Sequence, residues 1–456
     1  MFKLLTASTV LCAAFLVTTG PAATATAWPA SSSGTDIGGG LPSGFEPSGI
    51  VWDDFTGALW VVDDEGQLAR MLRDGTLPSD WDLTSTLNLG ALGLAALDLE
   101  GVAVTGTTQK LYLGNEYPPM ILEYNSSSTG DPTWTGKSWP LASFDPLATS
   151  SNGMEGLTWV PNGYHPYSNS SSGGLFYASS QASGTIYVYN VNLSTSGSTP
   201  APLASFTPDP SQTDISDLYF SPSTRTLFVL YDTANKVLEI DTTTTSYLIM
   251  NTYTLPASTT DQEGVTLLPQ CPGALTNIYL ADDEGNSGPH SIYLFDTFPQ
   301  LCATTLSATA DATTKQASPN SNYGLTASLT TDSATNADEN FLIRFSLSGI
   351  TTANINRARL LFNVTDGTDL SPQYCATTTS WSETGVTWNN QPVCSSNNGG
   401  GGASVANNSW VSYNVLGATQ GGWSSFRFTP RSTNHFGANS RQMGSNQPKL
   451  ILWMNQ

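Results

Sequence analysis

Short apolar runs alternate with turns along the first 300 residues and repeat a single plan. A short strand leads through a turn to an apolar strand that ends in acidic residues, and a second turn leads to a third strand. The plan recurs with aligned positions at Gly49, Gly101, Gly156, Asp217 and Gly264, so successive copies are 52, 55, 61 and 47 residues apart. This spacing predicts a radial array of similar β-sheets.

Segments between the copies also have strand-forming composition, including residues 138–144, 201–206 and 249–255. Each would add an outer strand and complete a four-stranded sheet. The last copy ends near Phe295 without such a segment, and because a ring must close we expect residues 28–41 to supply it. The repeat therefore predicts a five-bladed β-propeller, and a longer closing segment would make it six-bladed.

From about residue 306 the pattern changes to strands separated by Gly, Ser and Asn turns, with interspersed tryptophans. Residues 341–350 alternate between polar and apolar side chains, as a half-buried strand does. The chain is thus predicted to be all-β, with a propeller over residues 28–303 and a β-sandwich over residues 304–456.

Residues 1–27 have the pattern of a secretory signal peptide. Lys3 precedes an apolar run over residues 4–17, and small residues follow, so we expect cleavage after Ala25 or Ala27. The apolar run is shorter than the roughly 20 residues that a membrane span requires. We therefore expect a secreted, extracellular protein without a membrane anchor.

Four cysteines remain once Cys12 leaves with the signal peptide, and thiols tend to pair in an oxidising compartment. Three pairings are open, of which the short-range choice joins Cys271 to Cys302 and Cys375 to Cys394. Asn-x-Ser/Thr sequons, which carry glycans on surface loops of secreted proteins, occur at Asn125, Asn169, Asn192, Asn363 and Asn407.

The net charge of -21 is concentrated in the repeat region. Residues 1–300 hold 7 Lys and Arg against 29 Asp and Glu, whereas residues 301–456 hold 8 against 7. A strongly acidic surface repels nucleic acid and anionic membranes, so neither is expected as a partner. Cations or basic partners suit this part of the chain better.

Acidic residues gather at two places in the repeat, before the first strand and after the second. In an antiparallel pair these places share one edge of the sheet, so the acids should meet at one mouth of the central channel. The starts of first strands carry Glu46, Asp98, Glu100, Glu155, Asp214, Asp217, Asp261 and Glu263, and the ends of second strands carry Asp63, Asp64, Glu65, Glu116, Asp232, Asp282, Asp283 and Glu284.

Crowded carboxylates repel one another, so either their pKa values rise or a cation lies among them. Oxygen ligands favour calcium, and the scarcity of histidine argues against a transition metal. The candidate calcium ligands at the mouth are Glu46, Glu100, Glu155, Asp217 and Glu263. The alternative is that these acids cap turns and keep the surface soluble.

Several short motifs in the repeat resemble known propeller families. They are LEGV at Leu99, GNE at Gly114, MEGL at Met154, QEGV at Gln262 and DDEG at Asp282. Over about residues 40–300 this pattern resembles the SdiA-regulated family and, more loosely, the esterase-like phytase propellers. The first resemblance implies a calcium-compatible propeller of poorly defined role. The second implies hydrolysis of phosphate esters, although Lys and Arg, which would bind phosphate, are sparse there.

The C-terminal region contains ADAT, PNSNYG, FLIRFSLSGI and SETGVTWNNQP in that order. Over residues 306–455 it resembles the DNRLRE-type domain, which is similar to carbohydrate-binding modules of family 96. The resemblance implies a jelly-roll β-sandwich that binds polysaccharide, commonly beside another domain. One departure is a glutamine after Ser440-Arg441, where an acid is expected.

Sugar recognition needs aromatic faces for the pyranose ring and amides or charged groups for its hydroxyls. The candidate carbohydrate residues are Tyr323, Asn389, Trp410, Trp423 and Arg441, although most tryptophans at strand spacing belong to a core. Asp311, at the first strand of the sandwich, is a candidate ligand for structural calcium or a turn residue.

The chain contains no G-x-S-x-G elbow, H-E-x-x-H pair or phosphate-binding Gly-Lys-Ser/Thr loop, so catalytic residues are not assigned. We expect a monomeric protein that binds a cell-wall or matrix polysaccharide, with calcium as its candidate cofactor. The alternative is a calcium-dependent propeller hydrolase of phosphate esters or glycans that the C-terminal module delivers to its substrate.

Overall fold

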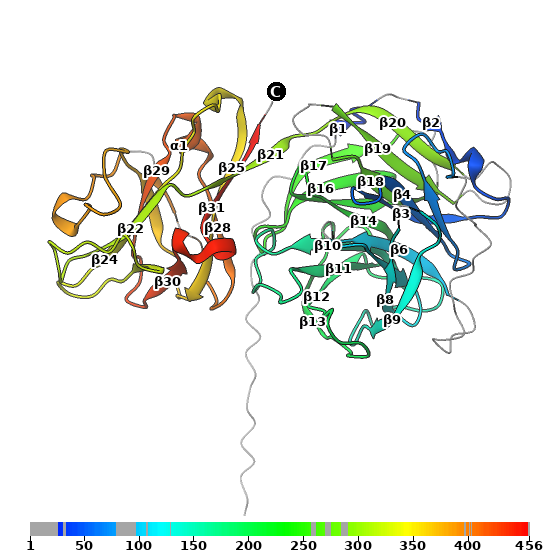
Figure 1. Cartoon of the computed structure of the whole chain (residues 1–456), viewed down its shortest axis with the longest axis horizontal. Helices are drawn as coiled ribbons and strands as arrows, with labels where there is room; N and C mark the ends of the chain where they lie inside the picture. The colour runs from blue at the N-terminus through cyan, green and yellow to red at the C-terminus, as the bar shows by residue number, and fades with distance from the viewer. Residues whose placement is uncertain are drawn as a thin grey trace, which may run out of the picture.

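The protein is all-β, and its strands form two units that lie side by side in Figure 1. The computed structural model describes residues 26–30, 33–78, 97–105, 108–127, 129–256, 261–269, 275–283, 291–395, 398–400, 402 and 404–454. Within these ranges the one α-helix is the short α1 (Leu416–Gln420). No helix in the described ranges has the length and apolar character needed to cross a membrane.

The described strands of the N-terminal unit form five sheets, each built mainly from consecutive antiparallel strands. The first contains β3 (Pro47–Asp53), β4 (Ala58–Asp63) and β5 (Leu68–Met71). The second contains β6 (Leu99–Val104), β7 (Lys110–Asn115), β8 (Met120–Asn125) and β9 (Thr133–Pro140). The third contains β10 (Met154–Pro161), β11 (Gly174–Ser180), β12 (Thr185–Tyr189) and β13 (Pro202–Phe206).

The remaining two sheets also receive strands from the N-terminal residues. The fourth contains β14 (Ile215–Ser221), β15 (Thr226–Tyr231), β16 (Lys236–Asp241), β17 (Leu248–Thr254) and the added strand β1 (Thr26–Ala27). The fifth contains β18 (Gln262–Leu267), β19 (Leu275–Asp282), β20 (Ser291–Pro299) and β2 (Thr35–Asp36). Because β2 pairs with β20, the expected closing segment does supply the outer strand of the last sheet.

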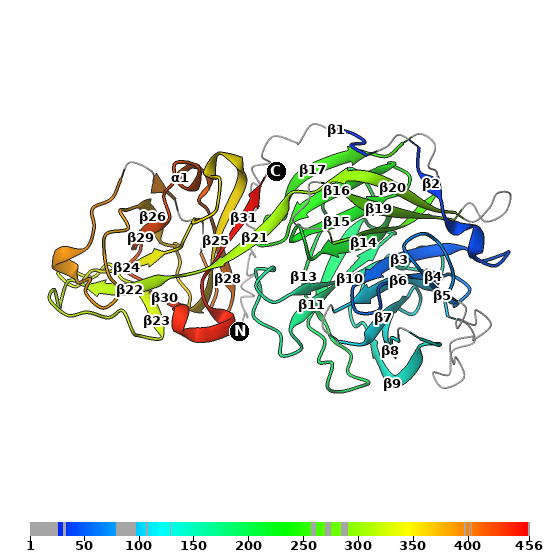
Figure 2. The same cartoon turned by 45° about the horizontal axis from the view of Figure 1, so that its top comes forward.

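The first strands of the five sheets contact one another in a closed cycle that runs β3, β6, β10, β14, β18 and back to β3. Figure 2 shows β3, β6, β10 and β14 towards the middle of this unit, with β9 and β13 nearer its rim. The backbones are close enough to require glycine: a Cβ at Gly49 would lie 2.1 Å from the carbonyl oxygen of Glu100, and one at Gly156 would lie 2.5 Å from the nitrogen of Leu218. The recurring glycine of the repeat therefore allows neighbouring sheets to meet around the centre.

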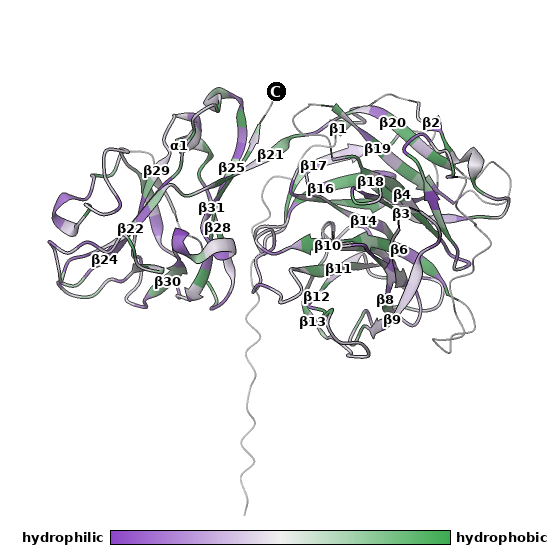
Figure 3. Ribbon diagram, in the orientation of Figure 1, coloured by the Kyte–Doolittle hydropathy of each residue, from purple (hydrophilic) through white to green (hydrophobic). Residues whose placement is uncertain are grey.

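Burial follows the position of each strand in its sheet. Strands β4, β14 and β15 are buried along their whole length, whereas the residues of the outer strands β13 and β17 are mostly half-buried or exposed. Green hydrophobic bands accordingly run along the inner strands in Figure 3. Burial on both faces explains why the inner strands read as continuous apolar runs in the sequence.

The C-terminal unit packs two antiparallel sheets on a shared core. One contains β21 (Cys302–Ser307), β31 (Lys449–Met454), β25 (Ile355–Asp366), β30 (Phe436–Asn439) and β23 (Ser328–Thr331), with β28 (Trp410–Asn414) also paired to β25. The other contains β22 (Ala310–Lys315), β24 (Glu339–Arg344), β29 (Ser425–Thr429), β26 (Gln373–Ala376) and β27 (Asn398–Gly399). Short 3-10 turns are η1 (Gly38–Gly40), η3 (Thr352–Asn354), η4 (Trp388–Asn390) and η5 (Arg441–Asn446).

Aromatic rings join the two sheets of this sandwich. Phe341 stacks on Phe428 with centroids 4.6 Å apart, and Phe362 of the facing sheet meets Phe428 edge to face at 5.0 Å. The predicted Cys375–Cys394 disulfide is present. The other expected bridge involves Cys271, which lies outside the described residues.

An apolar interface joins the two units. Trp453 and Ile451 of the sandwich share a buried cluster with Tyr164 of the repeat region, and the Trp453 indole donates a hydrogen bond to the carbonyl of Thr224. The fully buried carboxylate of Asp241 accepts hydrogen bonds from the guanidinium groups of two sandwich arginines, Arg357 at 3.4 Å and Arg359 at 3.1 Å. The sequence pattern did not predict this interface.

Candidate functional site

A β-bulge interrupts the start of the first strand in each of the five sheets described for the N-terminal unit. A bulge leaves a residue unpaired and turns its side chain away from the regular alternation. The residues at these bulges are Ser48, Glu100, Glu155, Ser216 and Glu263. Three of the five are glutamates, so the Glu-Gly motif of the sequence marks a place where the backbone redirects an acid.

The redirected glutamates share a cavity of about 250 Å³ with other polar residues. The cavity is lined by Ser48, Asp64, Asp98, Glu100, Glu116, Ser150, Ser151, Glu155, Gln181, Glu263 and Asp283. Asp64, Glu116 and Asp283 directly follow the second strands β4, β7 and β19, as the antiparallel geometry predicts. Seven carboxyl groups thus converge, and no Lys or Arg side chain is among the lining residues. We call this site the acidic cavity.

Asp98 lines the same side of the cavity as Glu100 and Glu116 and acts to raise the pKa values of both. Burial raises the pKa of Glu116 to about 7, and the neighbouring Asp98 carboxylate acts in the same direction. Burial likewise raises the pKa of Glu100 well above its usual range. Glu116 therefore keeps a proton at a pH where an isolated glutamate has lost it.

The pKa values of four other acids of the cavity are also raised. Burial raises the pKa values of Glu155 and Glu263 well above the usual range of glutamate. Burial, followed by repulsion from neighbouring carboxylates, raises the pKa of Asp64 to about 7 and that of Asp283 to about 6. The acidic cavity therefore holds protons more tightly than isolated carboxylates do, which is the condition under which a cation or a proton-transfer role is favoured.

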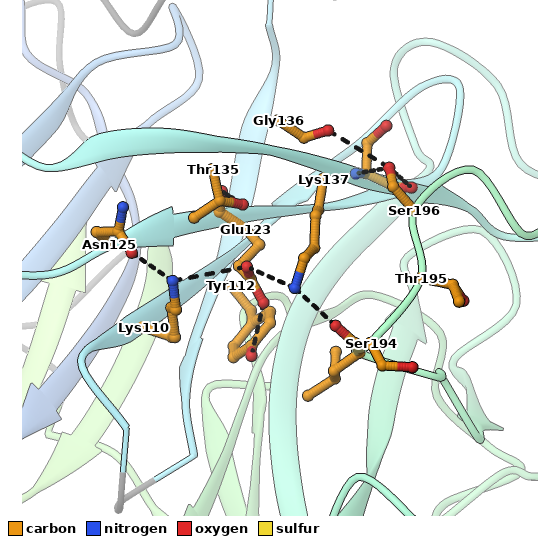
Figure 4. Close-up of polar contacts among 12 residues, drawn as sticks. Lys110, Tyr112, Glu123, Asn125, Thr135, Gly136, Lys137, Ser194, Thr195 and Ser196 are labelled. Carbon is orange, nitrogen blue, oxygen red and sulfur yellow. Dashed lines mark hydrogen bonds and ion pairs between the residues drawn. The ribbon is translucent and has the colours of Figure 1, made fainter.

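Glu123, a buried carboxylate outside the cavity, has a different environment. It accepts a hydrogen bond from the Tyr112 hydroxyl at 3.1 Å and forms ion pairs with Lys110 at 3.7 Å and Lys137 at 3.3 Å (Figure 4). Lys137 also donates a hydrogen bond to the carbonyl of Leu193, which links the second sheet to the third. Two of the few basic residues of the repeat region thus compensate a structural carboxylate, and the acidic cavity has no such compensation among its described lining residues.

Three of the five predicted calcium ligands at the mouth meet in the cavity, namely Glu100, Glu155 and Glu263. Glu46 is half-buried and does not line it, although its charge raises the pKa values of Asp64 and Asp283. Asp217 also does not line it.

Asp217 occupies the glycine column of the repeat, and its carboxylate accepts backbone hydrogen bonds from Leu218 at 2.7 Å and Val265 at 2.8 Å. It therefore ties the fourth sheet to the fifth. The acids that the ligand prediction left out, Asp64, Asp98, Glu116 and Asp283, all belong to the edge positions that the repeat identified.

Calcium is compatible with the oxygen donors of the acidic cavity. However, within the described part of the chain no group of three or more His, Cys, Asp or Glu side chains is arranged to hold a metal ion. The carboxyl groups line the wall of a cavity and do not surround one point. Calcium binding therefore stays a prediction.

Asp311 and Arg441 of the sandwich, predicted as a calcium ligand and a carbohydrate residue, belong to one network. Asp311 accepts a hydrogen bond from the backbone of Arg441 at 2.7 Å, and the Arg441 guanidinium binds Glu383 through two contacts of 2.5 and 2.6 Å. Gln442, where the family pattern has an acid, also donates to Glu383 at 3.2 Å. Burial raises the pKa of Asp311 to about 7. This network braces the edge of the sandwich.

The other carbohydrate candidates do not form one surface. Asn389 is exposed and is hydrogen-bonded to Asn320, in the same loop as Tyr323, whose ring lies 5.4 Å from the Lys315 ammonium. Trp423 packs partly on the sandwich core. Trp410 is only 4% exposed and lies at the interface between the two units.

The sequons differ in exposure. Asn192 and Asn407 are exposed, Asn125 and Asn169 are half-buried, and Asn363 is buried with a hydrogen bond from Asn439 at 2.8 Å. The Asn169 side chain also accepts a hydrogen bond from the Trp410 indole at 2.9 Å, across the interface.

Comparisons with known proteins find a matching family model for part of the N-terminal unit and for the sandwich. Among solved structures, a putative oxidoreductase (glucose dehydrogenase) from Thermus thermophilus is 12% identical, with 57% of this chain and 98% of that chain covered and a TM-score of 0.33. A search of curated proteins finds no match. Residues 43–237 match the family described as esterase-like activity of phytase, and residues 302–454 match carbohydrate-binding module family 96. The looser resemblance to the esterase-like phytase propellers is thus confirmed over residues 43–237 and the resemblance to carbohydrate-binding module family 96 over residues 302–454, whereas the resemblance to the SdiA-regulated family stays a prediction.

Proposed function

We propose that this is a secreted polysaccharide-binding protein, in which a jelly-roll module holds the glycan and a five-bladed propeller carries a calcium site at its acidic cavity. The observation that supports glycan binding is the match of residues 302–454, essentially the whole sandwich, to carbohydrate-binding family 96. The exposed amide of Asn389 and the half-buried ring of Tyr323 offer positions for such a ligand.

Calcium binding follows from the charge balance of the cavity. Seven carboxyl groups converge, and no basic side chain is among the lining residues. By contrast, the one buried carboxylate of Glu123 has two lysine partners. Placing a divalent cation among the seven would replace their protons and remove their mutual repulsion. The carboxyl groups would rotate towards the ion, because the described conformation does not surround one point.

Polysaccharide binding is tested by depletion. The mature protein is mixed with insoluble cellulose, chitin, xylan, mannan and β-1,3-glucan, and the fraction left in solution is measured. Retention by at least one of these polymers, and release by its soluble oligosaccharide, is expected. If the protein remains in solution with all of them and with anionic polymers such as pectin and alginate, the proposal is wrong.

A second candidate is hydrolysis of phosphate esters or glycans in the acidic cavity. Two observations favour it: the phytase-like family match over residues 43–237 and the raised pKa of Glu116, which suits a general acid near neutral pH. Phosphate would need the proposed cation, because the lining residues include no Lys or Arg. Release of phosphate or reducing ends by the wild type, lost in Glu116→Gln, would support this activity, and equal rates in both proteins would exclude it.

A further inference from the structure

A second cavity, of about 400 Å³, lies between the repeat region and the sandwich. One wall comes from the loop after β10, which contains Tyr167, and from the turn after β16, which contains Thr243–Thr245. The other wall comes from Ser404–Ala406 and the start of β28, which lies on the side of the sandwich that faces the propeller in Figure 1. Its volume falls within the range of roughly 300–1,000 Å³ that is typical of small-ligand sites. We call it the interdomain cleft.

The chemistry of the cleft differs from that of the acidic cavity. No charged side chain is among its described lining residues, and six of its hydroxyl groups come from Thr243, Thr244, Thr245, Ser404, Ser409 and Ser412. Tyr167 and Trp410 are the aromatic residues of its lining. A dense set of neutral hydroxyl groups beside aromatic rings suits a ligand that is itself neutral and rich in hydroxyl groups.

The walls of the cleft are held in place by the interface. Asp241, which binds Arg357 and Arg359 across the interface, also accepts a hydrogen bond of 2.6 Å from the Thr243 hydroxyl. The backbone N–H of Trp410 donates to the carbonyl of Pro166 at 3.0 Å. A ligand would therefore meet walls whose geometry is already set, which lowers the entropic cost of binding.

The cleft is accessible and has unused hydrogen-bonding capacity. Thr245, Ser404 and Ala406 are exposed, so solvent reaches it. The Ser371 hydroxyl, buried beside Tyr413, makes no hydrogen bond of normal geometry to any described residue. A buried hydroxyl that lacks a well-formed hydrogen bond carries a desolvation cost that a ligand hydroxyl could remove.

We infer that the interdomain cleft binds a neutral oligosaccharide segment, so that one glycan chain contacts the sandwich and the repeat region together. This inference rests on the proposed function and adds the location of the glycan and its lack of charge. Neither unit provides the cleft alone, and the interface is therefore part of the binding site.

The test uses the full mature chain and four soluble neutral ligands: cellohexaose, xylohexaose, mannohexaose and chitohexaose. Calorimetric titration is performed on the wild type and on Thr245→Trp and Ala406→Trp, which fill the cleft from opposite walls. Thr378→Trp is the control, because Thr378 is an exposed threonine of the sandwich outside the cleft. Thermal unfolding checks that each variant is folded, and having two filling variants allows for the failure of one.

At least one hexasaccharide should bind the wild type with one site per chain, and both filling variants should weaken it at least tenfold while Thr378→Trp does not. If the filling variants bind as tightly as the wild type, or if no neutral hexasaccharide binds, the cleft is not the site. Retention of the same protein by insoluble polysaccharide would then show that the proposed function still holds. Absence of both kinds of binding would overturn the function and the cleft together.

Discussion

The Glu116 carboxylate accepts a hydrogen bond from the backbone N–H of Gly153 at 2.7 Å. Glu116 follows the second strand of one sheet, and Gly153 precedes the first strand of the next. The contact therefore holds a cavity acid at the junction between two sheets. Because the pKa of this carboxyl group is raised to about 7, its protonation near neutral pH should affect how well the two sheets are joined.

The stability of the cation-free protein should fall as pH rises from about 4.5 to about 7. In this window folded Glu116, whose pKa is raised to about 7, keeps a proton that the unfolded chain has lost, so higher pH favours unfolding. Asp64 acts in the same direction. Urea unfolding in the presence of chelator at several pH values measures the slope.

Asp311 of the sandwich also contributes to this slope, since its pKa is raised to about 7. The Glu116→Gln variant removes the contribution of one cavity acid. Its free energy of unfolding should therefore fall less steeply with pH than that of the wild type. A wild-type stability that increases with pH across the window would contradict the assigned pKa shifts.

Removing the Asp217 carboxylate should destabilise the N-terminal unit by about 2–4 kcal/mol, because two buried backbone N–H groups would lose their acceptor. Denaturant unfolding of Asp217→Ala measures the loss. The exposed Asp296 is the matched control, and Asp296→Ala should change the stability by no more than about 0.5 kcal/mol. Similar stabilities for the two variants would mean that Asp217 does not tie the sheets together.

Neutralising Asp241 should weaken the interface between the units, since it would leave Arg357 and Arg359 without their buried partner. Breaking a buried ion pair from one side costs about 3–5 kcal/mol. Asp241→Asn should therefore lower the unfolding midpoint and speed proteolysis near residues 300–301, between β20 and β21.

The control is the more exposed pair of Lys236 and Asp209, where Asp209→Asn should cost less than about 1 kcal/mol. Equal sensitivity of the two variants to protease would argue against a rigid interface.

Expression in a eukaryotic host should give glycans at the exposed Asn192 and Asn407 and none at the buried Asn363. Attachment at Asn363 would disrupt its hydrogen bond with Asn439 and place a large polar group in the sandwich. Peptide mapping by mass spectrometry gives the occupancy at each site. Full occupancy of Asn363 in folded protein would show that this strand is placed wrongly.

The repeat could be predicted from the sequence because each copy has the same order of strands and carries acidic residues at the same strand ends. The Glu-Gly motif even identified Glu100, Glu155 and Glu263, since each of them lies at the bulge where the first strand of its sheet begins. Asp217 was misjudged because the alignment put it among acids without showing that its column faces neighbouring backbone.

The interface could not be predicted for a different reason. Alternation in a strand reveals which face is covered but not what covers it. Trp410 was accordingly assigned to a ligand surface, and the structure buries it against the other unit.

The central claim, a calcium site in the acidic cavity, is tested most directly by calorimetric titration of calcium into chelator-treated mature protein, followed by thermal unfolding with and without the metal. We predict tight binding, a higher unfolding midpoint, and loss of both when Glu100 and Glu155 are changed to glutamine. Glu339→Gln, in the sandwich, is the control and should bind calcium as the wild type does. No heat of binding and no change in the midpoint would contradict the claim.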